Sequence, residues 1–139
     1  MKVLVLPKTD LDLFAAVLQQ FGEVHAPVAK DDGARDGGGF VFARLTSWSE
    51  ARLDYQRTLL PPKKYVLPQR ETLFRYRHGE GFVPCSEDLD KRIVLFGVHP
   101  CDIYGLDILD QVFAGRYPDP YYQTRRKNLL VIGLDCMPD

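Results

Sequence analysis

The sequence lacks long hydrophobic runs and has no excess of either charge. Its formal net charge is −1, from 18 basic and 19 acidic side chains. The chain as a whole therefore lacks the positive field typical of proteins that bind nucleic acid or anionic lipid. No apolar run approaches the roughly 20 residues that span a bilayer, and the apolar start at residues 1–7 is too short for a signal peptide. We expect a cytoplasmic protein with no nucleic-acid partner and no membrane insertion.

The sequence is also poor in cysteine, with Cys85, Cys101 and Cys136 spread widely. An odd number at such spacing does not suit a disulfide framework and fits a reducing compartment. The Cys-x-x-Cys pairs of structural zinc sites are absent. Three glycines at residues 37–39 are not followed by Lys-Ser or Lys-Thr and lead into a strand, so they predict a hairpin loop instead of a phosphate loop.

What is present suffices for one domain, because 139 residues with 45% hydrophobic content can bury a core. Apolar periodicity predicts strands at residues 2–6, 23–29, 40–44, 72–77, 81–84, 92–98 and 129–134, and helices that begin near Thr9, Pro100 and Asp119. Prolines between residues 61 and 68 exclude a regular helix or central strand there, so this segment either straps one face or contacts a partner. The predicted fold class is α/β, a single domain over residues 1–139 that has a small mixed sheet with a C-terminal parallel βαβ unit and flanking helices.

The last third contains two apolar strands that are each followed by a cysteine. Helices between the strands predict that they are parallel, and ligands of open α/β sheets collect beyond the carboxyl ends of such strands. Cys101 and Cys136 would then share one rim. Cys101 also stands at a helix start beside Pro100, where backbone amides favour a thiolate, the form that binds iron-sulfur clusters. Three interpretations remain open: metal ligands, small half-buried residues at strand ends, or a reactive thiol with His99 as base.

Other candidates lie next to these elements. Asp102 follows Cys101 and is expected to cap its helix, which would support the loop that carries the thiol. Arg125 and Arg126 suit a phosphate, a carboxylate or a partner surface, and Tyr121 lies one helical turn before Arg125. The alternative for these arginines is a solvated charged face.

Four segments occur in a familiar order: LPPKKYVLPQRE at 60–71, GVHPCDI at 97–103, DPYYQTRRKN at 119–128 and GLDC at 133–136. Through them, residues 53–136 resemble the amino-terminal part of the beta subunits of hydrogenase, sulfhydrogenase and anaerobic sulfite reductase complexes. The resemblance implies an electron-relay subunit that carries iron-sulfur clusters, performs no bond chemistry itself, and works with a flavin or metal catalytic subunit.

The resemblance also implies a ligand set. Family members continue with a Cys-Phe-Cys segment and a ferredoxin-like domain, and Cys101 and Cys136 would join the Cys-Phe-Cys thiols around one 4Fe-4S cluster. This chain stops at Asp139. We therefore expect the amino-terminal piece of a longer subunit, in preference to a short natural relative, with no complete cluster on these residues alone. The competing hypothesis is a nucleotide- or protein-binding module in which Arg125, Arg126 and the nearby tyrosines line the same sheet rim.

Overall fold

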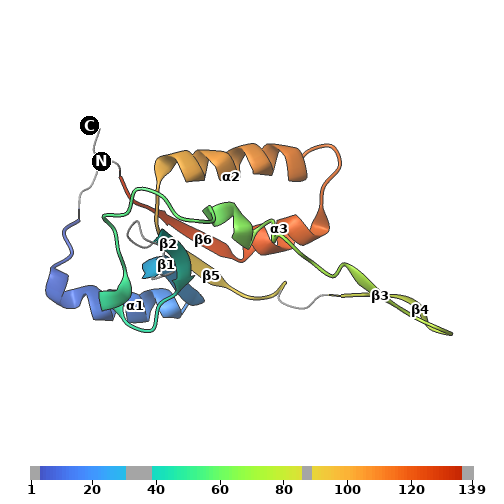
Figure 1. Cartoon of the computed structure of the whole chain (residues 1–139), viewed down its shortest axis with the longest axis horizontal. Coiled ribbons are helices and arrows are strands. Elements are labelled where there is room, and N and C mark those ends of the chain that lie inside the picture. The colour runs from blue at the N-terminus through green and yellow to red at the C-terminus, as the bar shows by residue number, and fades with distance from the viewer. Residues whose placement is uncertain (1–3, 31–38, 86–88, 136–139) are drawn as a thin grey trace.

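The protein is built on a four-stranded mixed sheet, seen in a computed structural model that describes residues 4–30, 39–85 and 89–135 (Figure 1). The strand order is β2-β1-β5-β6, from β1 (Glu23–Lys30), β2 (Gly39–Arg44), β5 (Ile93–Val98) and β6 (Leu129–Gly133). β1 runs antiparallel to β2 and parallel to β5, and β5 runs parallel to β6. The predicted α/β class, with its parallel C-terminal unit, is confirmed.

Helices cover both faces of this sheet. α1 (Leu11–Gln19) lies on one face, and α2 (Pro100–Phe113) and α3 (Pro120–Lys127) lie on the other (Figure 1). Two apolar clusters result. One joins Leu18 of α1 to Val94 of β5, and the other joins Leu95 of β5 to Leu106 of α2. Neighbouring residues of β5 thus point into different clusters, as expected for an apolar strand covered on both faces.

The amino-terminal segment differs from the sequence-based expectation. Residues 4–6 are not in a strand, and Leu4 and Val5 are 80% and 89% exposed. The strand that lies beside β5 in parallel is instead β1, with Glu23 paired to Ile93. The strand predicted at residues 2–6 is therefore wrong for residues 4–6, and residues 1–3 lie outside the described part. Residues 31–38 of the loop predicted between β1 and β2 also lie outside the described part.

The proline-containing segment packs against the α2 side of the sheet. It forms a short 3-10 helix, Pro62–Tyr65, in which Pro62 is fully buried, and the next residue, Val66, belongs to the cluster of Leu95 and Leu106. The segment is therefore a strap, as one of the two interpretations held, and it contributes to the core.

In the part of the chain that the structure describes, no helix is long and apolar enough to cross a membrane.

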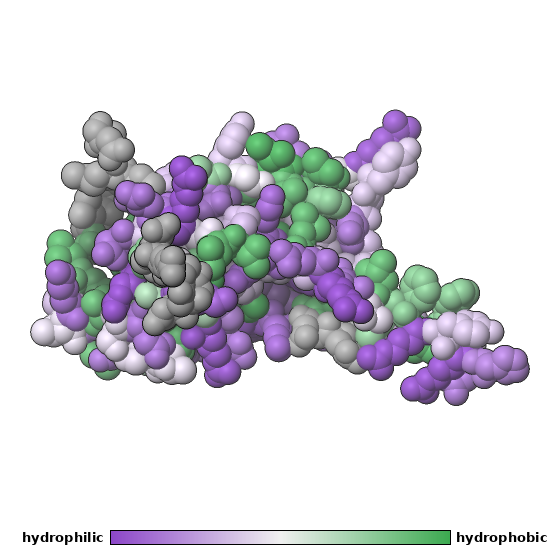
Figure 2. All heavy atoms as spheres, in the orientation of Figure 1, coloured by the Kyte–Doolittle hydropathy of each residue, from purple (hydrophilic) through white to green (hydrophobic). Residues whose placement is uncertain are grey.

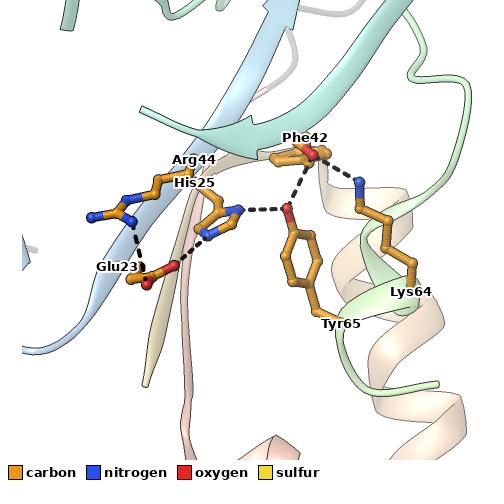
Figure 3. Close-up of polar contacts among 6 residues, drawn as sticks. All are labelled: Glu23, His25, Phe42, Arg44, Lys64 and Tyr65. Carbon is orange, nitrogen blue, oxygen red and sulfur yellow. Dashed lines mark hydrogen bonds and ion pairs between the residues drawn. The ribbon is translucent and has the colours of Figure 1, made fainter. Parts of the chain in front are cut away.

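Polar contacts fasten this strap to the sheet (Figure 3). The Tyr65 hydroxyl lies 2.8 Å from His25 Nδ1 and donates to the Phe42 carbonyl at 3.1 Å. Lys64 Nζ donates to the same carbonyl at 2.7 Å. On its other side, His25 Nε2 lies 3.5 Å from the Glu23 carboxylate. The network joins residues about 40 positions apart, so no local pattern in the sequence indicated it.

Burial shifts the protonation equilibria of this network. It lowers the pKa of His25 below 6.5, against the opposing effect of Glu23, while Lys64 and Arg44 add to the lowering. Burial also lowers the pKa of Lys64 and raises the pKa of Tyr65. Because burial penalises the charged form, the folded protein favours a neutral His25 at neutral pH.

The carboxyl end of β5 depends on Gly97. This residue has φ +80°, and it lies at an irregularity in the pairing of β5 with β6. A Cβ atom here would lie 2.9 Å from Leu53 Cδ2. Gly97 thus permits both a backbone conformation that other residues rarely adopt and close packing of the preceding loop.

We predict that Gly97→Ala lowers the free energy of unfolding by about 1–3 kcal/mol, because it adds φ strain and a steric clash. Gly79, in the exposed hairpin turn, has φ +86° but nothing within 4 Å of an added Cβ. Gly79→Ala therefore tests the φ strain alone, and it should lower the free energy of unfolding by less than Gly97→Ala does. Gly105, within α2, has open space, and Gly105→Ala should stabilise by up to about 1 kcal/mol. Urea unfolding followed by circular dichroism measures all three, and equal effects at positions 79 and 97 would contradict the role given to Leu53.

We also predict that the free energy of unfolding falls as the pH drops below about 6.5, since the unfolded chain protonates His25 at a higher pH than the folded chain does. One such proton gives a slope of at most about 1.4 kcal/mol per pH unit. His25→Gln should reduce the slope of the free energy of unfolding against pH, whereas His78→Gln, on the exposed hairpin, should leave this slope unchanged. Urea unfolding between pH 5 and 7.5, roughly the range in which histidine titrates, makes the comparison. An unchanged slope in His25→Gln would show that another group is responsible.

Candidate functional site

The carboxyl ends of β5 and β6 form the rim at which the sequence places two cysteines. Val98 pairs with Gly133, and the Leu134 amide donates to the Val98 carbonyl at 2.8 Å, so the two strands end at the same level. Cys101 and Cys136 each follow this pair by three positions. Cys136 lies outside the described residues, so the place of its thiol stays a prediction.

Cys101 is an exposed residue in the first turn of α2. The helix begins with Pro100 after the N-cap residue His99, whose backbone is extended. Proline suits this first helical position because it fixes φ and its missing N–H has no helical partner to lose. The thiol therefore stands at the positive end of the helix dipole, where negative charge is stabilised.

Three chain segments hold this helix start in place. The His99 ring stacks on Tyr55, with ring centroids 4.1 Å apart and an interplanar angle of 8°. Tyr55 in turn donates from its hydroxyl to the Gly97 carbonyl at 2.9 Å. On the neighbouring strand, a Cβ at Gly133 would lie 2.9 Å from Ile103 Cδ1, so glycine allows α2 to pack closely on the end of β6. The stack of His99 on Tyr55 joins residues 44 positions apart, so no local sequence pattern predicts it.

Asp102 does not play the part predicted for it. The α2 N-cap is His99, whose side chain makes no capping hydrogen bond, and the Asp102 backbone amide donates to the His99 carbonyl at 3.0 Å. Burial raises the pKa of the Asp102 carboxyl, against the opposing charges of His99 and Lys63. Asp102 therefore adds a half-buried carboxyl beside Cys101 instead of a capping bond.

The donor set of the rim fits an iron-sulfur cluster in part. Cysteine thiolates are the usual ligands of iron-sulfur clusters, and the Cys101 side chain is exposed, so a cluster could reach it. Among residues 4–30, 39–85 and 89–135, no group of three or more His, Cys, Asp or Glu is placed to hold a metal ion. Cys101 alone therefore does not make a metal site among the described residues.

Cys85 is not near this rim. It follows β4 (Gly81–Pro84), and its amide donates to the Leu73 carbonyl at 3.0 Å at the base of the hairpin formed by β3 (Phe74–Arg77) and β4. Figure 1 shows this hairpin at the far side of the molecule from the start of α2. Cys85 therefore serves as an internal comparison for the cysteines of the rim.

The candidate arginines lie at the amino ends of the parallel strands, opposite the rim that carries Cys101. α3 leads directly into the start of β6, where Leu129 pairs with Ile93. Arg125 and Arg126 thus belong to the amino ends of the parallel strands, whereas Cys101 follows a carboxyl end. The hypothesis that the arginines and the cysteines line the same rim is wrong, because chain direction puts α3 before β6 and α2 after β5.

These side chains also have partners within the chain. Arg125 binds the Glu71 carboxylate, and the Tyr121 hydroxyl donates to the Leu73 carbonyl at 3.0 Å. The first contact attaches α3 to the segment that follows the strap, and the second attaches α3 to the base of the β3–β4 hairpin. The predicted capping of α3 by Asp119 is confirmed, since its carboxylate accepts from the amides of Tyr121 and Tyr122 at 2.8 and 3.1 Å.

Arg126 joins α3 to α2. Its Nε lies 3.1 Å from both carboxylate oxygens of Asp110, which also accepts from the Tyr122 hydroxyl at 2.6 Å. Tyr122 is 1% exposed and its ring stacks on Phe113. Arg126 and Tyr122 therefore join α3 to α2 through an ion pair and a buried ring.

A cleft of about 200 Å³ opens beside this edge. Lys64, Lys91 and Arg125 contribute cations to its lining. Lys64 is bonded to the Phe42 carbonyl and Arg125 to Glu71, so cations of this lining are already engaged within the chain. The cleft is consequently a weaker candidate for an anion site than its composition suggests.

Comparison with known proteins gives the family. No family model matches the chain, and no solved structure matches it. Sulfhydrogenase 2 subunit beta of Pyrococcus furiosus is 43% identical over 122 residues, which are 88% of this chain and 34% of that protein. The chain therefore spans about a third of the length of this relative. Over the matched residues, the chain belongs to the hydrogenase and sulfhydrogenase beta-subunit-like family.

Proposed function

We propose that this chain is the amino-terminal α/β domain of an electron-transfer subunit in a multi-subunit redox complex of the hydrogenase or sulfite reductase type. The relative is a sulfhydrogenase beta subunit, which supports a subunit role, and its greater length supports a longer parent chain. In this proposal the domain relays electrons and catalyses no bond chemistry. A flavin- or metal-containing subunit would be its partner.

Within that role, Cys101 and Cys136 supply thiolates to an iron-sulfur cluster that residues outside this chain complete. The observation that supports the proposal most is the pairing of Val98 with Gly133, because the strands that precede Cys101 and Cys136 end there at the same level. A cluster bound there would supply one-electron transfer. The chain's own contribution is to hold the Cys101 thiolate at the positive end of α2, in a loop fixed by the stack of His99 on Tyr55.

The nucleotide-binding alternative has less support. It required Arg125 and Arg126 to face a ligand at the carboxyl rim, and both are engaged with carboxylates at the other edge. A protein-binding role remains compatible with the electron-relay role, because a relay subunit must contact its donor and acceptor.

Anaerobic purification of the full-length subunit with Cys101→Ser or Cys136→Ser tests the proposal. Each variant should lose the iron of one cluster and its electron paramagnetic resonance signal, because serine is a poor ligand for iron-sulfur clusters. Cys85→Ser, at the hairpin base, is the matched control and should retain both. Iron content per protein and the resonance spectrum of the reduced sample are the measurements, with circular dichroism as a check that the variants fold.

Full iron content in both rim variants would contradict the ligand assignment. Loss of iron in Cys85→Ser, with Cys101→Ser unaffected, would move the site to the hairpin base.

A further inference from the structure

The β3–β4 hairpin, residues 72–84, projects from the body of the molecule as an arm (Figure 1). Its two strands form a sheet of their own, separate from the four-stranded sheet. Every residue of β3 is exposed, and in β4 only Gly81 is partly covered. An isolated two-stranded hairpin is marginally stable in water, so this arm gains stability when another surface covers it.

One face of the arm is aromatic. Phe74 pairs with Pro84 across the strands and Tyr76 pairs with Phe82, so these four side chains share a face. Phe82 lies at the centre, with its ring 5.0 Å from that of Phe74 and 5.5 Å from that of Tyr76. The three rings are 55%, 64% and 70% exposed in chain order. Figure 2 shows apolar atoms along one side of the arm and hydrophilic ones along the other.

The other face is basic. Arg75 and Arg77 alternate with the aromatic residues of β3, and the arm carries one acidic residue, Glu80, which lies 3.5 Å from Arg77 in an exposed pair. Exposed pairs of this kind contribute little stability, so Glu80 leaves Arg77 able to exchange partners. A contiguous exposed apolar patch beside positive charge is typical of a protein-protein contact.

The edges of the hairpin disfavour a second copy of the chain as the occupant. Antiparallel pairing of β3 with its own copy, in a register that keeps the aromatic residues of both copies on one face, would set arginines opposite arginines, and like charges on neighbouring strands are destabilising. Pairing through β4 meets Pro84, which has no backbone N–H to donate to a new strand. The charges of the arm thus select a partner of opposite sign.

We propose that this arm docks into an apolar groove on a different polypeptide, with Phe82 as its central anchor and with acidic side chains of the partner beside Arg75 and Arg77. The proposal rests on the subunit role given above, and it does not depend on which cysteines bind iron. Aromatic residues and arginine are the types that dominate binding energy at protein interfaces.

Photocrosslinking in cells that make the native complex tests this docking. The full-length subunit carries p-benzoylphenylalanine in place of Phe82, or in place of Tyr117, which is 78% exposed and lies outside the arm. After irradiation, mass spectrometry maps the joined peptides. The probe at position 82 should join to a different polypeptide, at an apolar segment flanked by Asp or Glu, and the probe at position 117 should not give that product. Arg75→Glu combined with Arg77→Glu should lower the yield at position 82 by at least about tenfold, because it sets like charges against each other.

Joining to a second copy, to another part of the same polypeptide, or to a segment without acidic neighbours would overturn the proposal. So would the absence of any joined product, or an unchanged yield in the charge-reversed variant. Iron content separates this proposal from the cluster assignment: the charge-reversed variant should keep its iron, and Cys101→Ser should keep the joined product. The arm is exposed, so circular dichroism should show an intact fold in every variant.

Discussion

Burial of β5 on both faces is the constraint that organises this protein. Val94 and Leu95 are fully buried on opposite sides of the strand, each in its own cluster. Complete burial of such a side chain stabilises the fold by about 1.5–3 kcal/mol, so the two clusters hold the strand between the two helical layers. Its backbone pairs on both sides, in parallel with β1 and with β6.

Parallel pairing determines at which end of the strands the candidate functional side chains lie. The strands that flank β5 leave their carboxyl ends on one side and their amino ends on the other, and the connecting helices separate the functional groups accordingly. Cys101 falls on the carboxyl side, where Gly97 and Gly133 allow loop and helix to approach the strand ends closely. Arg125 falls on the amino side, where it binds Glu71 in the segment that follows the strap. One rim is left open with a thiol, and the other is closed by ion pairs.

The strap and the β3–β4 hairpin differ in how much of their surface is buried. The strap at residues 62–66 buries Pro62 and Val66 and is fastened by the contacts of Tyr65 and Lys64, so it belongs to the body. The hairpin that follows it buries almost nothing and keeps three aromatic rings in solvent. Electron transfer between subunits requires a fixed approach of donor and acceptor. A stable body that carries the thiol rim, together with an exposed arm for docking, meets that requirement in the role proposed for the chain.

Local sequence determined the elements whose signals are local. The apolar run at residues 93–98, the Asp119-Pro120 start of α3 and the glycines that flank Glu80 each predict the structure observed, because backbone propensity, capping and turn chemistry act within a few residues. Tertiary structure alone decided which strand lies beside β5, which carboxylate binds each arginine, and that His25 meets Tyr65 and His99 meets Tyr55. These choices join residues 16 to 70 positions apart, and they follow from the burial of whole faces at once. The apolar residues at 4–6 illustrate the difference: their composition suits a strand, but they form none and Leu4 and Val5 are exposed.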